Sequence, residues 1–179
     1  MLLGLGANIS GAWGTPTQTL LRALDELGQL GLQPLYRSRL YRTKPVGPGR
    51  QPPYLNAVVM SQASLPPMAL LRGLKGLEKR AGRRGGRRWG PRPLDLDILD
   101  YGGRRLGWPP AGRRRRGGLI LPHPEAHRRA FVLLPLAEIA PHWRHPVLGL
   151  SAQALLRRVR TAGRATGAQP LDFAPSPCQ

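Results

Sequence analysis

The segment from Leu94 to Tyr101 alternates between apolar and other residues with the two-residue period of a β-strand. Successive side chains of a strand point to opposite faces, so Asp95 and Asp97 share one face and the apolar residues beside them share the other. Two carboxylates on alternate residues lie roughly 7 Å apart, and they repel each other unless a cation lies between or beside them. The pattern predicts a strand with a buried apolar face and an acidic face that needs positive charge.

Two interpretations of the aspartate pair are open from spacing alone. One is a solvated strand face on which the aspartates pair with nearby arginines. The other is a magnesium site, because Mg²⁺ favours one or two carboxylates and completes its coordination with water and phosphate oxygens. The preceding residues Arg88, Trp89 and Arg92 favour the second interpretation, since guanidinium groups match phosphate geometry and an indole stacks on heterocycles.

The charge of the chain points to an anionic partner. The formal net charge is +19, from 28 Lys and Arg against 9 Asp and Glu in 179 residues, and such a charge attracts polyanions, nucleic acid above all. The arginines cluster on either side of Asp95 and Asp97, however, and a plain nucleic-acid-binding surface gains little from carboxylates there. Non-specific nucleic-acid binding is therefore the second hypothesis, behind a site for a metal-bound polyphosphate.

The length suits one domain with a hydrophobic core, which we expect at residues 1–160. The arginine- and glycine-rich residues 104–118 are expected to form a basic, exposed insertion, and residues 161–179 a flexible tail. Cys178 is the single cysteine, so no internal disulfide is possible. The chain lacks a signal-peptide pattern and an apolar run of about 20 residues, so we expect a cytoplasmic protein without a membrane partner.

Hydrophobic periodicity predicts the regular elements. Strands are expected at residues 1–5, 35–42, 54–60, 94–101 and 119–121, and helices at 16–28, 64–81 and 151–160. Thr15 and Gln18 have the spacing of a capping box, and Ser64 and Ser151 are the expected caps of the later helices. A Gly-x-Gly at Gly6 could let the backbone approach a phosphate, but a lone glycine pair is weak evidence. A turn that closes the first strand is favoured, where the next polar residue, Asn8, would bond to its own backbone.

Beyond these local patterns, the chain resembles the hydroxymethyl-dihydropterin pyrophosphokinase family of the folate pathway from about Leu3 to Pro141. The resemblance rests on Gly6-Ala7-Asn8, Tyr41-Arg42-Thr43, Val46-Gly47-Pro48, Tyr54-Leu55-Asn56, Arg88-Trp89-Gly90-Pro91-Arg92, Leu94-Asp95-Leu96-Asp97, Pro122-His123-Pro124 and Arg129-Ala130-Phe131. It implies an α+β fold, a ferredoxin-like three-layer αβα sandwich with a mainly antiparallel central sheet, that works as a monomer. The sequence departs from the family pattern at Ala7 and Lys44.

The resemblance also implies a reaction, in which ATP gives pyrophosphate to the hydroxymethyl group of 6-hydroxymethyl-7,8-dihydropterin and AMP leaves. Asp95 and Asp97 would hold two Mg²⁺ ions and would be catalytic together with Arg83 and Arg92. The implied ATP-binding residues are Glu78, Arg84, Trp89, Arg92, Ile98, His123 and Arg129. The implied pterin-binding residues are Thr43, Val46, Tyr54, Asn56 and Phe131. Whether Arg84 or Arg87 supplies the second arginine of the loop stays open, as does the use of the run Arg113–Arg116.

Overall fold

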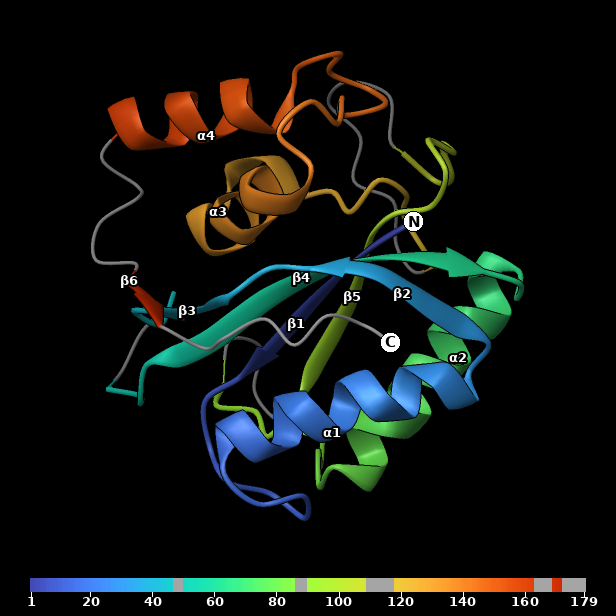
Figure 1. Ribbon diagram of the computed structural model, residues 1–179, viewed down its shortest axis with the longest axis vertical. Coiled ribbons are helices and arrows are strands. Elements are labelled where there is room, and N and C mark those ends of the chain that lie inside the picture. The colour runs from blue at the N-terminus through green and yellow to red at the C-terminus, as the bar shows by residue number, and fades with distance from the viewer. Residues whose placement is uncertain (47–49, 86–89, 109–117, 163–168, 172–179) are drawn as a thin grey trace.

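An antiparallel sheet separates two pairs of helices (Figure 1). The computed structural model describes residues 1–46, 50–85, 90–108, 118–162 and 169–171. Its strands are β1 (Leu2–Ala7), β2 (Leu32–Arg37), β3 (Leu40–Thr43), β4 (Tyr54–Ala63), β5 (Asp95–Asp100) and β6 (Gln169–Leu171). Its helices are α1 (Pro16–Gln29), α2 (Pro67–Arg80), α3 (Ala130–Ile139) and α4 (Ala152–Thr161), with the 3-10 helix η1 (Ala126–Arg128) before α3.

The topology is that of the expected sandwich. Helices α1 and α2 cover one face of the sheet, while α3 lies on the other face with α4 packed on it (Figure 1). The strand order is β5-β1-β4-β3-β6, with β2 also paired to β4, and the pairings among the described strands are antiparallel. The succession β1-α1-β2-β3-β4-α2-β5 has β1 and β4 at the centre of the sheet. It is ferredoxin-like if β2 and β3 are counted as one broken strand, so the predicted fold class is confirmed.

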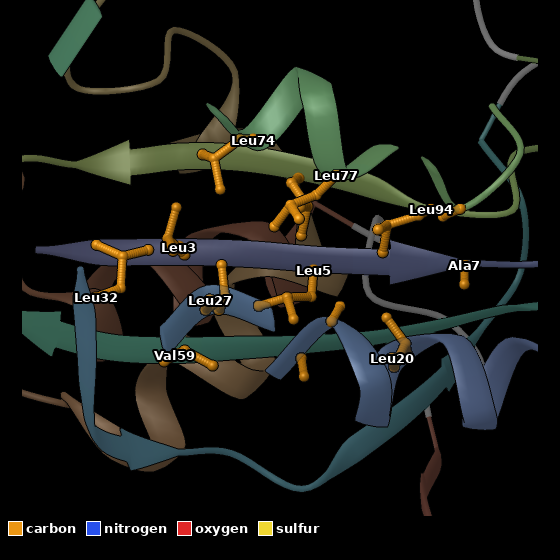
Figure 2. Packing of buried hydrophobic residues seen from close by; sticks show 14 of the residues in the cluster. Leu3, Leu5, Ala7, Leu20, Leu27, Leu32, Val59, Leu74, Leu77 and Leu94 are labelled. Carbon is orange, nitrogen blue, oxygen red and sulfur yellow. The ribbon is translucent and has the colours of Figure 1, made fainter. Parts of the chain in front are cut away.

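Alternation along the central strands divides the core into two layers. Leu3, Leu5 and Ala7 of β1 are buried against α1 and α2 (Figure 2), whereas Leu2 of the same strand belongs to the cluster under α3 and α4. On β5, Leu96 packs with the first cluster, and its acidic neighbours point to the opposite face. The strand face predicted from the Leu-Asp alternation is therefore confirmed.

The predicted helix starts are right in two cases and wrong in one. Thr15 and Gln18 form the capping box of α1, and the Ser151 hydroxyl accepts the Ala154 N–H at 3.1 Å at the start of α4. Ser64 does not cap α2, because the helix begins only at Pro67 and the Ser64 hydroxyl donates to the Gly31 carbonyl at 3.4 Å instead.

Long-range pairing changes three other predictions. The strand expected at 35–42 is broken into β2 and β3 by Ser38, whose N–H donates to the Val58 carbonyl at 2.9 Å and whose hydroxyl accepts the Val58 N–H at 3.0 Å. In the segment expected to be a strand at 119–121, Leu121 makes an isolated bridge with Leu106. Within the expected flexible tail at 161–179, Gln169–Leu171 forms the strand β6, which pairs with β3.

The remaining domain predictions concern segments that the structure covers in part. Of the expected insertion at 104–118, the residues 109–117, including Arg113–Arg116, lie outside the described residues. Within the described ranges, no helix has the length and apolar character that a membrane span requires.

A buried histidine closes the end of the sandwich near α4. His145 is fully buried, and its ring centre lies 5.4 Å from that of Trp108, 5.5 Å from that of His127 and 5.8 Å from that of Trp143. Its Nδ1 accepts the backbone N–H groups of Val147 at 3.3 Å and Leu148 at 3.2 Å. Burial, with a smaller contribution from His127, lowers the pKa of His145 from 6.5 to about 4.

We predict that this histidine makes the fold sensitive to mild acid. The unfolded chain binds a proton at His145 below about pH 6.5, and the folded chain only near pH 4. The contribution of the neutral His145 to the free energy of unfolding is therefore complete above pH 6.5 and is lost as the pH falls toward 4. Urea unfolding should show a loss on the order of 2–3 kcal/mol over this interval. His145→Asn should flatten the dependence and the exposed control His142→Asn should not; an equal slope in all three proteins would contradict the assignment.

Candidate active site

A cavity of about 250 Å³ opens on the α3 side of the sheet, between the strands and the first turn of α3. The strand register aligns four residues: Asp95 on β5, Gly6 on β1 and Asn56 on β4, which line the cavity, and Tyr41 on β3, which lies beyond its lining. Directly opposed residues of neighbouring strands present their side chains to the same face. One transverse row therefore runs from a carboxylate, over a glycine, to an amide and a phenol.

Strand β1 contributes two glycines to the floor of the cavity. Gly4 and Gly6 both face it, and neither has a side chain. A Cβ at Gly6 would lie 3.0 Å from Asn56 Oδ1, and a Cβ at Gly4 would lie 3.3 Å from Leu99 Cδ2. The turn predicted at Gly6 is wrong, because β1 continues to Ala7; the glycines leave a trough, the β1 trough, between β5 and β4.

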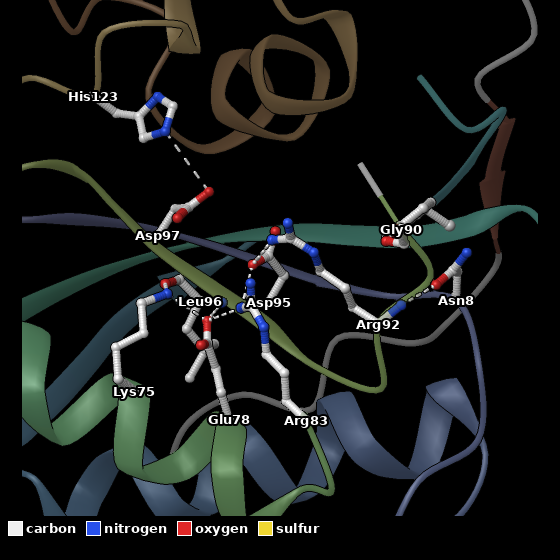
Figure 3. A network of polar contacts seen from close by, with 11 residues as sticks. Asn8, Lys75, Glu78, Arg83, Gly90, Arg92, Asp95, Leu96, Asp97 and His123 are labelled. Carbon is white, nitrogen blue, oxygen red and sulfur yellow. Dashed lines mark hydrogen bonds and ion pairs between the residues drawn. The ribbon is translucent and has the colours of Figure 1, made fainter. Parts of the chain in front are cut away.

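The aspartates stand along the β5 side of this trough. Both line the cavity, Asp95 opposite Gly6 and Asp97 opposite Gly4. Asp95 Oδ1 accepts from Arg83 Nη1 and from Arg92 Nη1, each at 2.7 Å (Figure 3). Burial alone would raise the pKa of Asp95, but the two guanidinium groups outweigh it and hold that pKa below its usual value. The carboxylate is therefore ionised and faces the cavity. Its pairing with arginines matches the first interpretation of the aspartate pair, and its position in the cavity wall is compatible with the magnesium interpretation.

Asp97 has a different neighbour. Its Oδ2 lies 3.8 Å from His123 Nε2, and 36% of its side chain is exposed (Figure 3). His123 Nδ1 accepts the Glu125 N–H at 3.2 Å, which leaves the proton of the neutral ring on Nε2, toward Asp97. Burial lowers the pKa of His123 although Asp97 opposes this shift, so the ring is neutral near pH 7.

Glu78 supports the site from below and does not line the cavity. It is only 2% exposed, and its Oε1 accepts the Leu96 N–H at 2.8 Å and Lys75 Nζ at 2.7 Å. The same oxygen lies 2.6 Å from Arg83 Nη1, the group that reaches Asp95 (Figure 3). The resemblance predicts that Glu78 contacts ATP. In the structure Glu78 lies under β5, where the charge of its carboxylate holds Arg83 against Asp95.

Two further residues predicted for the ATP site do not line the cavity. Ile98 is buried in the core under α1 and α2, and Arg84 is exposed after α2; neither lines the cavity. Trp89 lies outside the described residues. His123, Arg92 and Arg129 do line the cavity, and their binding of ATP stays a prediction.

All five residues predicted to bind the pterin line the opposite end of the cavity: Thr43, Val46, Tyr54, Asn56 and Phe131. Asn56 Nδ2 donates to Thr43 Oγ1 at 2.8 Å, which fixes the amide so that Oδ1 lies toward Gly6. The Tyr54 hydroxyl donates to the Gly90 carbonyl at 3.0 Å, and burial raises the pKa of Tyr54, so it remains a protonated donor. Phe131 approaches from α3, across from the sheet.

A buried asparagine fixes the backbone of Arg92. Asn8 Oδ1 accepts the Arg92 N–H at 2.7 Å, and the Asn8 N–H donates to the Arg92 carbonyl at 3.0 Å (Figure 3). Its Nδ2 donates to the Pro52 carbonyl at 3.2 Å. The expectation that Asn8 bonds to its own backbone is wrong, because these three contacts join segments distant in sequence.

Sequence reasoning missed several lining residues. Gly4, Lys44, Leu99 and Val132 belong to the cavity wall. For Gly4 the signal was the Gly-x-Gly that it forms with Gly6, for which a turn was favoured over approach of the backbone to a phosphate. Leu99 and Val132 carried no signal, because apolar residues that line a cavity look like core residues in the sequence.

The two aspartates fit Mg²⁺ that arrives with a polyphosphate. Among the described residues no group of three or more His, Cys, Asp and Glu side chains could hold a metal ion, so a pre-assembled transition-metal centre does not fit there. Mg²⁺ takes one or two carboxylates and draws its other ligands from water and phosphate oxygens. Asp95 and Asp97, on one face with guanidinium groups beside them, provide that donor set.

Comparison with known proteins agrees with this geometry. Residues 2–141 match the family model described as 7,8-dihydro-6-hydroxymethylpterin-pyrophosphokinase (HPPK). The chain is 39% identical over 159 residues to 2-amino-4-hydroxy-6-hydroxymethyldihydropteridine pyrophosphokinase of Synechocystis sp., covering 88% of this chain and 75% of that protein. It is 40% identical over 139 residues to the Haemophilus influenzae protein of the same name, covering 77% of this chain and 79% of the other.

A solved structure supports the fold. The HPPK-DHPS protein of Plasmodium falciparum superposes with a TM-score of 0.65 at 14% identity, over 92% of this chain and 44% of that one. This chain therefore spans less than half of the solved chain, and the likeness concerns the fold alone. The sequence matches decide the family: this chain belongs to the 7,8-dihydro-6-hydroxymethylpterin pyrophosphokinases, a family of diphosphokinases of folate synthesis.

Proposed function

We propose that this chain transfers pyrophosphate from ATP to the hydroxymethyl group of 6-hydroxymethyl-7,8-dihydropterin, with AMP and the pterin diphosphate as products. One observation carries the proposal: a single cavity has a carboxylate pair with guanidinium groups on one side of the β1 trough and an amide between aromatic side chains on the other. A two-substrate transfer needs both halves within reach of each other.

The pterin half suits a flat, polar heterocycle. Tyr54 and Phe131 approach the cavity from the sheet and from α3, and aromatic faces favour stacking on a flat ring. Asn56 offers a fixed amide, with Oδ1 as an acceptor for ring N–H groups and Nδ2 as a donor. Apolar walls with a few placed polar groups are typical of sites that bind small molecules.

The nucleotide half suits a triphosphate. Arg92 and Arg129 line the cavity and would bind phosphate oxygens. Asp95 and Asp97 would hold two Mg²⁺ ions, which would neutralise charge on the transferred group and stabilise the attacking and leaving oxygens. The contacts of Arg83 and Arg92 keep Asp95 ionised before the substrates bind.

The β1 trough lies where the transfer would occur. The pterin hydroxymethyl oxygen forms a bond to the β-phosphorus of ATP and its proton is released to solvent. The bond from that phosphorus to the oxygen bridging to the α-phosphate breaks, and AMP departs with the bonding electrons. Because Gly4 and Gly6 lack side chains, the phosphates can lie close to β1 between the carboxylates and Asn56. We also propose, as the family resemblance implies, that the enzyme works as a monomer, and we expect it in the cytoplasm.

The proposal predicts AMP formation that depends on Asp97. With ATP, Mg²⁺ and the hydroxymethyl pterin, the wild-type protein should release AMP, measured by chromatography. Asp97→Ala should lower kcat by about two to three orders of magnitude, comparable with the loss of one electrostatic stabiliser of a transition state.

The matched control is Asp25→Ala, which removes an exposed carboxylate from α1 and should leave turnover unchanged. Near-wild-type turnover of Asp97→Ala would contradict the metal assignment. A wild-type protein that makes no AMP, but binds nucleic acid with an affinity falling steeply with salt, would favour the second hypothesis instead.

The β1 trough predicts a second effect, from the smallest possible side chain. Gly6→Ala places a methyl group 3.0 Å from Asn56 Oδ1, and such overpacking costs about 1–3 kcal/mol. The pterin KM should therefore rise by about tenfold or more, measured by AMP release at saturating ATP. Gly76→Ala is the control, because a Cβ there meets no atom within 4 Å; equal kinetics of the two variants would show that the trough is not used.

A further inference from the structure

One carboxylate joins the two walls of the pterin half of the cavity. Glu138, in the last turn of α3, accepts the Tyr41 hydroxyl at 2.8 Å through Oε2 and Arg39 Nε at 3.1 Å through Oε1. The Arg39 backbone N–H also points to this carboxylate, at 3.3 Å from Oε2. We call Arg39, Tyr41 and Glu138 the Glu138 clamp.

The clamped elements carry the residues that would hold the pterin. Tyr41 and Thr43 lie two residues apart on β3 and so share a face, and Thr43 fixes the Asn56 amide. Helix α3 carries Phe131 in its first turn and follows directly on Arg129. The separation of Phe131 from Asn56 therefore depends on how α3 is seated over β3 and β4.

Apolar packing alone fixes that seating weakly. The contact of α3 with the sheet is made by buried aliphatic side chains, and hydrophobic attraction is non-directional. Pro135 lies inside α3 and has no N–H to donate to the carbonyl four residues earlier, that of Phe131. A directional contact at the far end of α3 is thus what can hold Phe131 at a defined position.

The hydrogen bond between Tyr41 and Glu138 is retained at neutral pH. Tyr41 is 6% exposed, and burial, helped by the hydrogen bond to Glu138, raises the pKa of Tyr41, so its hydroxyl remains a donor. Hydrogen bonds to an ionised group contribute roughly 1.5–3 kcal/mol. Asp95, Asp97 and His123 of the nucleotide half lie on β5 and the segment after it, which the clamp does not touch. Arg129, directly before α3, is the one described nucleotide-half residue next to the clamped helix.

We infer that Glu138 and Tyr41 are positioning residues that set the width of the pterin slot, an inference that rests on the proposed function. Neither side chain lines the cavity, so both act through α3 and β3. Loss of the clamp should weaken binding of the pterin far more than binding of ATP.

The experiment compares KM and kcat of Glu138→Gln, Tyr41→Phe and wild type. Each substitution keeps the shape of the side chain and removes the charge or the hydroxyl. The pterin KM should rise about five- to tenfold, roughly 1–1.4 kcal/mol, while the ATP KM changes less than about twofold. The two effects should add only in part in the double variant, because both substitutions act on the Tyr41–Glu138 hydrogen bond and only Glu138→Gln also acts on the Arg39 contacts.

Glu26→Gln is the matched control. Glu26 is ion-paired to Arg22 and Arg80 and its side chain is 21% exposed, against 26% for Glu138, but it lies on the α1–α2 side. Its kinetics should equal those of wild type. Equal increases of both KM values in Glu138→Gln, or wild-type values in both clamp variants, would overturn the inference.

Two further readouts separate the possible failures. Thermal unfolding of each variant, with Tyr41→Phe as the milder change, distinguishes a loosened slot from a protein that does not fold. Direct titration of the pterin by fluorescence measures the slot without turnover. Absence of AMP formation by the wild-type protein would refute the proposed function, whereas unchanged pterin affinity in both folded clamp variants would refute the clamp.

Discussion

The site depends on a strand that builds the core with one face and offers no side chain on the other. Leu3, Leu5 and Ala7 of β1 are buried under α1 and α2, and the alternate positions Gly4 and Gly6 form the cavity floor. Because β1 lies between β5 and β4, any side chain at the glycines would fill the space between the aspartates and Asn56. The same strand therefore anchors the sheet and leaves room for the reacting groups.

Electrostatic support of the site extends through the sheet. Glu78 is buried below β5 and binds Arg83, which reaches Asp95, while Arg92 binds the same aspartate from the other side. A buried charge is tolerated only when it is paired, and loss of one partner leaves the other uncompensated. This chain of alternating charges presents an ionised carboxylate to the cavity without exposing the acid that positions it.

Local periodicity made part of this structure predictable. The alternation around Asp95 and Asp97 predicted one acidic strand face, and the Thr15 and Gln18 pattern predicted the start of α1, because both signals depend on residues close in sequence. The resemblance to a family supplied the pterin residues, all of which meet in one cavity. The resemblance also assigned Glu78 to the ATP site. Its burial depends on how α2 packs under β5, which no local pattern encodes.

The remaining differences have the same origin. The break between β2 and β3 depends on hydrogen bonds from Ser38 to Val58, and β6 exists through pairing with β3. Gly6 looked like a turn residue because glycine favours turns locally, whereas its role comes from Asn56 on the neighbouring strand. Contacts between distant segments decide each of these features.

The most direct test of the central claim is a crystal structure of the protein with the hydroxymethyl pterin, a non-hydrolysable ATP analogue and Mg²⁺. The account predicts that the β-phosphoryl group lies over Gly4 and Gly6, that metal density contacts both Asp95 and Asp97, and that the pterin lies between Tyr54 and Phe131. Phosphates bound away from the aspartates, or a pterin outside the β1 trough, would contradict it.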